Sequence, residues 1–292
     1  MALYYIALLA GLEHLMKAKV AIIFKEWIVL SIIQAVILGI VQGLTEFLPV
    51  SSSGHLTIVQ NIFGLEENML AFNVLLHVGT LIPVAIVYWK EIFKLIKNPF
   101  QKMTALLIVG TLPAVVAALL FGDLLDTLFA GGVFLAFAYI ITGILLMVCD
   151  KMPAGKKDEE DITFVDALTV GTIQAIAITP GISRSGSTIT GSVACGMNKA
   201  TASMFSFLLS IPAILGAVVL QLKDVVTGEA DFGNIGMAAA VAGFLASMIS
   251  GYLAIRFMLK LIKESKLKFF SYYVFALAVF ILADHYILHF IF

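Results

Sequence analysis

The sequence predicts an all-α polytopic membrane protein with an inverted-topology repeat, two re-entrant helical hairpins and about six full transmembrane helices. Composition indicates the membrane: 61% of the 292 residues are hydrophobic, 13% are charged, and mean hydropathy is +1.05. Soluble domains average about 45–50% apolar and about 25% charged residues. The second observation is a pair of polar, glycine-containing segments that resemble each other, and the third is the alternation of charge between loops. We expect the lipid bilayer, and no nucleic acid, as a partner.

Residues 1–27 form an N-terminal extension ahead of a single integral membrane domain at 28–292. The apolar stretch at 3–16 is shorter than the roughly 20 residues that a crossing helix needs. Three lysines follow this stretch rather than precede it: Lys17, Lys19 and Lys25. With no clear small-residue cleavage site, this order argues against a removable signal peptide. We expect an interfacial helix or an extra helix here.

Six apolar runs are long enough to cross a membrane. They lie at about 69–89, 104–121, 133–149, 201–221, 235–256 and 269–290. Two further apolar stretches, 28–60 and 164–197, are interrupted near their middle by Pro, Gly and Ser. Lipid cannot satisfy backbone N–H and C=O groups, so such a break must be covered by protein or line a wet cavity. Each stretch therefore predicts a helix–loop–helix hairpin that enters the membrane and turns back.

The two interrupted stretches repeat each other in sequence. A shift of 132 residues carries five residues of the first onto identical residues of the second: Gly39, Gln42, Ser51, Ser53 and Gly54 onto Gly171, Gln174, Ser183, Ser185 and Gly186. At a shift of 133, Phe72, Leu75 and Leu76 recur as Phe205, Leu208 and Leu209. We place repeat one at about 28–150 and repeat two at about 164–292. Interrupted apolar segments at matching positions of two halves indicate a site near the bilayer midplane.

Loop charges orient the spans. Cations gather in three places: Lys90, Lys94, Lys97 and Lys102; Lys151, Lys156 and Lys157; Arg256, Lys260, Lys263, Lys266 and Lys268. The intervening loops, 122–132 and 222–234, are mainly acidic. The positive-inside rule puts the lysine loops in the cytoplasm. The first hairpin then enters from outside and the second from inside, so the repeats are inverted.

The polar segments carry different chemistry. The first supplies Gln42, Glu46, Ser51, Ser52, Ser53 and His55, and the second supplies Ser183, Arg184, Ser185, Ser187 and Thr188. At the 132 shift Arg184 corresponds to Ser52, and Glu46 corresponds to the apolar Ile178. Ionisable residues inside a membrane are costly and indicate function.

Together these groups favour phosphoryl transfer at the membrane. An arginine fork with hydroxyls and helix-start N–H groups suits phosphate. Gly181 and Gly186 let the backbone approach a ligand closely. Glu46 could hold a divalent cation or act as a base, and His55 could act as acid, base or nucleophile.

Structural interpretations stay open beside these roles. Serines and glycines in membrane helices often serve close packing, and Gln42 and Gln174 could cap freed backbone groups. Glu46 and Arg184 could form a purely structural ion pair. His77, inside an apolar span, could line the site or serve packing.

The polar segments contain two motifs: Gln42-x-x-x-Glu46, continued by Phe47-Leu48-Pro49-Val50-Ser51-Ser52-Ser53-Gly54-His55, and Pro180-Gly181-Ile182-Ser183-Arg184-Ser185-Gly186-Ser187-Thr188. These motifs resemble the two signatures of the BacA/UppP undecaprenyl-diphosphatase family. The resemblance covers about 28–292 in layout. It implies hydrolysis of undecaprenyl diphosphate, a polyprenyl diphosphate lipid, to undecaprenyl phosphate and inorganic phosphate in the bacterial inner membrane. This reaction recycles the lipid carrier of peptidoglycan synthesis, and overproduction confers bacitracin resistance. A site open to the periplasm and a divalent cation, Mg²⁺ or Ca²⁺, are implied as well.

The resemblance also implies residue roles. Glu46 is the essential carboxylate, Ser52 and His55 serve as nucleophile or in proton transfer, and Arg184 clamps phosphate. The implied phosphate-binding set further includes Ser51, Ser53, Ser183, Ser185, Gly186 and Thr188, and the implied metal ligands are Glu46 and Gln42. Some family members have Glu where this chain has Gln42, and Gln cannot act as a base.

The sequence leaves a second function and an assembly open. A lipid transporter or flippase could use the same phosphate site, since broken helices in inverted repeats are typical of transporters. A homodimer is a possible assembly. The Ser52-Ser53-Gly54-His55 run also resembles acid-phosphatase-like membrane enzymes, but no His and Asp follow Arg184 as they do there, so we set that family aside.

Overall fold

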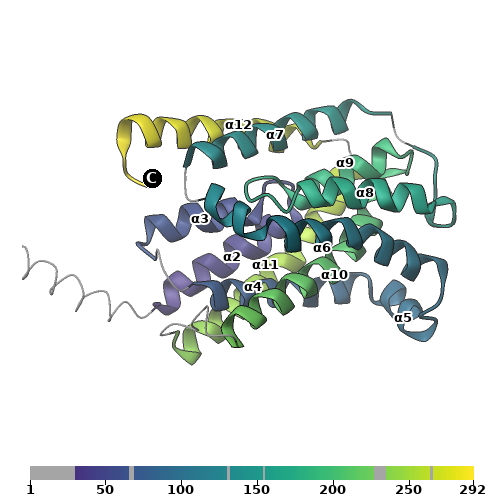
Figure 1. Ribbon diagram of the computed structural model, residues 1–292, viewed down its shortest axis with the longest axis horizontal. Helices are drawn as coiled ribbons and strands as arrows, with labels where there is room; N and C mark the ends of the chain where they lie inside the picture. The colour runs from purple at the N-terminus through teal and green to yellow at the C-terminus, as the bar shows by residue number, and fades with distance from the viewer. Residues whose placement is uncertain (1–29, 66–68, 130–131, 154, 227–234, 264–265) are drawn as a thin grey trace, which may run out of the picture.

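The computed structural model describes residues 30–65, 69–129, 132–153, 155–226, 235–263 and 266–292, and this part of the chain is helical (Figure 1). Its helices are α2 (Ile32–Phe47), α3 (Ser52–Ile62), α4 (Leu70–Val87), α5 (Trp89–Lys97), α6 (Lys102–Phe129), α7 (Gly132–Lys151), α8 (Phe164–Ile176), α9 (Arg184–Ala194), α10 (Lys199–Val226), α11 (Met237–Lys263) and α12 (Lys268–Ala283). A single isolated bridge, and no strand, is found among these residues. The all-α prediction is confirmed. The predicted N-terminal extension at 1–27 lies outside the described residues.

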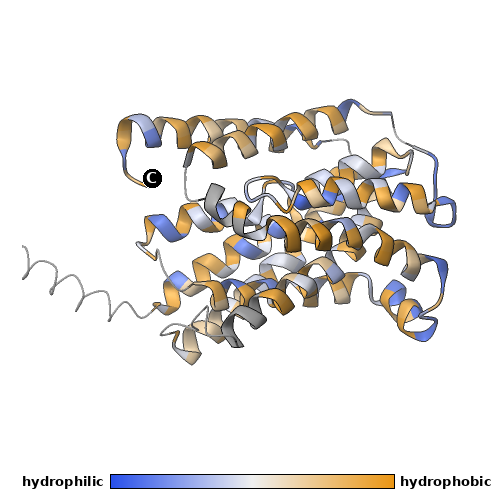
Figure 2. Cartoon of the chain, viewed as in Figure 1, coloured by the Kyte–Doolittle hydropathy of each residue, from blue (hydrophilic) through white to orange (hydrophobic). Residues whose placement is uncertain are grey.

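Within the part of the chain that the structure describes, six helices are long and apolar enough to cross a membrane: α4, α6, α7, α10, α11 and α12. They coincide with the six predicted spans, which confirms a multi-pass membrane protein. Large apolar side chains stay exposed along them, as at Leu119 and Leu120, which are 66% and 70% exposed. In Figure 2 the hydrophobic colour runs along much of the length of the long helices. Lipid covers such surfaces.

The two interrupted stretches form two helix pairs, α2 with α3 and α8 with α9. Ser31 and Thr163 begin the first helix of each pair with a capping box, and Ser51 and Ser183 cap the second helix of each pair. Side-chain oxygens at these positions satisfy amide groups that a helix start leaves free. The sequence breaks therefore fall where predicted.

The repeat is visible in how helices pack. α2 lies against α11, and α8 lies against α6. A Cβ atom on Gly39 would lie 2.3 Å from the Gly243 carbonyl oxygen, and one on Gly171 would lie 2.4 Å from that of Gly110. Gly39 and Gly171 are 132 residues apart, and Gly110 and Gly243 are 133 apart. These are the shifts of the sequence repeat, so the two halves make the same glycine contact. The first helix of each pair, α2 or α8, thus rests on a long helix of the other half. The inverted orientation and membrane re-entry of the hairpins stay predictions.

The loops of the two helix pairs meet inside the bundle. In Figure 1, α2 and α3 lie toward the left end of the bundle, and α8 and α9 lie toward the right. The Gly181 amide donates to Ser53 Oγ at 3.4 Å, and Ser185 Oγ donates to the Leu48 carbonyl at 3.2 Å. Segments about half the chain apart thus share one contact region.

One predicted loop is wrong in part. The lysine-bearing segment after the first span, predicted to be a loop, contains helix α5. Its apolar residues, Trp89, Ile92, Phe93 and Ile96, recur three or four positions apart, which is the helical spacing. The lysines stand between these apolar residues, so their charge favours a loop while the apolar spacing favours a helix.

The paired glycine contacts predict a stability effect. Gly39→Ala or Gly171→Ala forces a methyl group against a carbonyl of the facing helix, so each should destabilise the protein by about 1–3 kcal/mol. Gly216→Ala is the matched control, because a Cβ on Gly216 meets nothing within 4 Å. Thermal unfolding in detergent measures the stability of each variant. If all three variants unfolded at the same temperature, the close helix contacts at Gly39 and Gly171 would be contradicted.

Candidate active site

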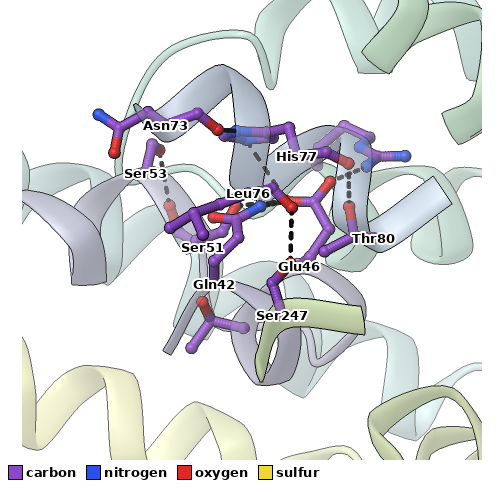
Figure 3. A network of polar contacts seen from close by, with 12 residues as sticks. Gln42, Glu46, Ser51, Ser53, Asn73, Leu76, His77, Thr80 and Ser247 are labelled. Carbon is purple, nitrogen blue, oxygen red and sulfur yellow. Dashed lines mark hydrogen bonds and ion pairs between the residues drawn. The ribbon is translucent and has the colours of Figure 1, made fainter. Parts of the chain in front are cut away.

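Glu46 lies near the end of α2 and is the centre of a buried polar cluster. Gln42 Nε2, one helical turn earlier, donates to Glu46 Oε2 at 3.0 Å, and Ser52 Oγ donates to the same oxygen at 2.7 Å. Figure 3 shows Gln42 and His77 on either side of the Glu46 carboxylate. The predicted pairing of Gln42 and Glu46 on one helix face is therefore present, and Ser52 is aimed at the carboxylate.

Arg184, the first residue of α9, forms an ion pair with Glu46. Its guanidinium Nη2 donates to Oε1, the oxygen that Gln42 and Ser52 leave free. The side chains are 17% and 5% exposed, so water contributes little to their solvation. The ion pair that the sequence left as an alternative exists, and it joins the two hairpins.

Two matching pairs of serines lie on either side of Ser52 and of Arg184 in the sequence. Ser51 and Ser53 lie 3.3 Å apart at their Oγ atoms, and their repeat mates Ser183 and Ser185 also lie 3.3 Å apart. Ser51 has φ of 70°, one of two positive values among the described non-glycine residues. Strain of this kind concentrates at functional sites.

Helix starts also converge here. α3 begins at Ser52 and α9 begins at Arg184, so the positive end of each helix dipole faces the joined loops. Gly186 allows this approach, since a Cβ there would lie 3.1 Å from Pro49 Cβ. The loops therefore offer an anion two helix N-termini and one guanidinium.

His55 lies in a separate aromatic setting. Nδ1 is 2.7 Å from the Ser51 carbonyl, which can only accept, so Nδ1 carries a proton. The Tyr139 hydroxyl is 3.0 Å from Nδ1, and the Tyr273 hydroxyl is 2.7 Å from Nε2. The partners of His55 in the described structure do not include Glu46, Ser52 or Arg184. The site thus has two adjoining parts, an ion-pair cluster and a histidine cluster.

The sequence did not single out Tyr139 and Tyr273. Tyr139 comes from α7 and Tyr273 from α12, and their rings lie 5.6 Å from the His55 ring, Tyr139 edge-on and Tyr273 stacked. The available signal is a phenol inside an apolar span, since a Tyr hydroxyl away from water needs a partner. That signal does not reveal which partner.

His77 belongs to the ion-pair cluster. Its Nδ1 is 2.7 Å from the Asn73 carbonyl, and its Nε2 is 3.8 Å from Glu46 Oε2. Of the two interpretations left open, the structure favours a residue that lines the site.

Thr188 is placed differently from the serines. Its Oγ1 donates to the Arg184 carbonyl at 2.9 Å and lies 2.6 Å from Ser206 Oγ on α10. This hydroxyl fixes the first turn of α9, which carries Arg184.

The comparisons with known proteins agree with one another. The family model of the bacitracin resistance protein BacA matches residues 35–280. The chain belongs to the BacA family. Undecaprenyl-diphosphatase of Carboxydothermus hydrogenoformans is 50% identical over 249 residues, which cover 85% of this chain and 95% of that protein. Undecaprenyl-diphosphatase 4 of Bacillus thuringiensis is 45% identical over 254 residues, covering 87% and 97%. Undecaprenyl-diphosphatase 4 of Bacillus cereus is 46% identical over 250 residues, covering 86% and 96%.

The groups that could hold a divalent cation in this BacA-family site are the Glu46 carboxylate and the Gln42 amide oxygen. Among the described residues no three His, Cys, Asp or Glu side chains form a ligand cluster. Gln42 Oε1, however, is buried without a hydrogen-bond partner, on the amide whose Nε2 reaches Glu46. Mg²⁺ commonly uses one or two carboxylates together with substrate phosphate oxygens. One carboxylate and one orphan amide oxygen suit such a site.

The buried ion pair predicts coupled stability. Arg184→Gln or Glu46→Gln alone leaves one uncompensated buried charge, which should destabilise the protein by about 3–5 kcal/mol. The double variant removes both charges, so its free energy of unfolding should fall by less than that of either single variant. Unfolding in detergent gives the loss of unfolding free energy for the two single variants and the double variant, which together form a double-mutant cycle. Simple additivity would show that the pair is not coupled.

Proposed function

We propose that this protein hydrolyses undecaprenyl diphosphate to undecaprenyl phosphate and inorganic phosphate, and so returns the lipid carrier of peptidoglycan synthesis to use. The observation that carries the proposal is the meeting of Glu46, Ser52 and Arg184 from two hairpins. The relatives named undecaprenyl-diphosphatase, matched over nearly their whole length, support the same reaction.

Arg184 and the two helix starts bind the diphosphate. The guanidinium has five N–H donors, and Glu46 occupies only part of them, so phosphate can bind at the remaining ones. The N-termini of α3 and α9 add partial positive charge where the terminal phosphate would lie. Charge stabilisation and positioning are the main contributions of a protein to phosphoryl transfer.

Glu46 and Ser52 supply the proton transfer at the attacking side. Ser52 Oγ already donates to Glu46 Oε2. As Ser52 Oγ bonds to the terminal phosphorus, its proton passes to Glu46 and the bridging P–O bond breaks, which releases undecaprenyl phosphate. Glu46 passes this proton to the leaving phosphate and, ionised again, takes a proton from the water that hydrolyses the phosphoserine. His55, with its proton on Nδ1, bonds the Ser51 carbonyl and accepts from the Tyr273 hydroxyl at Nε2, which fixes the start of α3 and so positions Ser52.

A divalent cation is part of the proposal. Glu46 and the Gln42 amide oxygen would hold Mg²⁺ or Ca²⁺, which when bound offsets charge on the phosphate oxygens.

The setting follows from the topology. The polyprenyl tail lies among the spans while the diphosphate reaches the joined loops. We place the protein in the bacterial inner membrane with this site open to the periplasm, as the family resemblance implies, and with the lysine loops on the cytoplasmic side.

Phosphate release from undecaprenyl diphosphate by the purified protein in vesicles tests the function. Glu46→Gln and Arg184→Ala should each lower the rate on the order of a thousandfold, since each removes charge stabilisation in a desolvated site. Two controls match them: Asp166→Asn, a carboxylate paired with Lys157, and Arg256→Ala, an exposed arginine. Near-wild-type rates in folded Glu46→Gln protein would refute the assignment.

The same assay also tests the need for a cation and the alternative function as a lipid transporter. A chelator should lower the wild-type rate, and added Mg²⁺ or Ca²⁺ should restore it. Lipid movement across the vesicles without phosphate release would instead identify a transporter.

The histidine cluster predicts a kinetic effect. Tyr273→Phe removes the hydroxyl on His55 Nε2 but keeps the stacked ring, so kcat should fall by up to about tenfold, the value of one hydrogen bond. KM should change little, because the phosphate clamp is untouched. The neighbouring Tyr272, which is exposed, provides the control variant Tyr272→Phe. A rise in KM at unchanged kcat would argue for a structural role only.

A further inference from the structure

Helix α5 is set apart from the spans by a fixed bend. It begins at Trp89, directly after Tyr88, where α4 ends with φ of −109° and ψ of 30°. Tyr88 is buried in the main core, which holds the bend in place. α5 lies at one end of the bundle (Figure 1), at the end where the lysine-bearing connections gather.

α5 has three faces with different surroundings. Ile92 and Leu95 pack against the main core. Trp89, Phe93 and Ile96 form an apolar ridge that is 58–72% exposed. The lysines of α5 make up the third face, and all three are exposed: Lys90, Lys94 and Lys97. Figure 2 shows hydrophilic and hydrophobic residues on different sides of this helix.

We propose that α5 is a docking surface for the anionic phospholipid leaflet, with its apolar ridge in the headgroup–acyl boundary and its lysines on lipid phosphates. Amphipathic helices with aromatic residues on one face and lysines on the other lie in this way. Tryptophan is enriched at the same depth. Glu91 is the single acid in the helix, so its net charge is positive and complementary to acidic lipid. Because α5 continues rigidly from α4, this docking fixes the height of α4, which carries His77, in the bilayer.

Tryptophan fluorescence locates the ridge. The chain has two tryptophans, so Trp27→Phe leaves Trp89 as the reporter. In vesicles of phosphatidylcholine and phosphatidylglycerol, bromine near the glycerol end of the acyl chains should quench Trp89 more than bromine near the chain end. Strong quenching by aqueous acrylamide would place the ridge in water and overturn the proposal. Quenching by neither reagent would place it against protein, such as a second copy, and would also overturn it.

Lipid retention tests the charges. The variant Lys90→Gln/Lys94→Gln/Lys97→Gln should retain phosphatidylglycerol roughly tenfold less well or worse in native mass spectrometry, with phosphatidylcholine unaffected. The control is Lys151→Gln/Lys156→Gln/Lys268→Gln, which removes the same charge away from α5. An equal loss from both variants would mean diffuse attraction and would contradict a site on α5. These lysines are surface residues, so all variants should fold.

Discussion

The pairing of Glu46 with Arg184 is the constraint that the rest of the architecture serves. A charge inside an apolar bundle is tolerated when it is paired and hydrogen-bonded. The acid ends one hairpin helix and the arginine begins another, about half the chain later, so neither half can satisfy its charge alone. The hairpin loops must therefore meet, and the hydrogen bonds between them, from Gly181 to Ser53 and from Ser185 to Leu48, hold them together. Scaffold and site are thus specified by the same contact.

The glycine contacts explain how the loops reach that position. The contacts of Gly39 with Gly243 and of Gly171 with Gly110 bring α2 and α8 each onto a long helix of the other half at backbone contact distance. Small residues are what allow such approach in membrane helices, where no hydrophobic driving force acts between helices. The two contacts are equivalent, but the residues they position are not: Ser52 stands where the second half has Arg184. A symmetric frame therefore presents an asymmetric set of reactive groups.

Much of this could be predicted from the sequence, because hydropathy, helix breaks and repeats are local or periodic signals. The spans, the capped breaks at Ser51 and Ser183 and the shared face of Gln42 and Glu46 follow from such signals. The contacts of His55 with Tyr139 and Tyr273 could not be predicted, since they join positions 84 and 218 residues apart with no pattern between them. Helix α5 differs from the predicted loop for another reason: its lysines indicate a cytoplasmic connection, and they interrupt the apolar spacing that indicates a helix.

The ion pair also constrains how substrate can bind. Phosphate bound at the donors of Arg184 that Glu46 leaves free, as proposed, would share the guanidinium charge with Glu46 and add negative charge beside that buried carboxylate, which is costly. A cation at Glu46 and Gln42 Oε1 would offset that cost, so cation and diphosphate should each strengthen the binding of the other, as linkage requires. Without both, the pair closes on itself and keeps the site neutral. A chain this apolar can therefore hold reactive charges in the membrane because, without substrate, they satisfy each other.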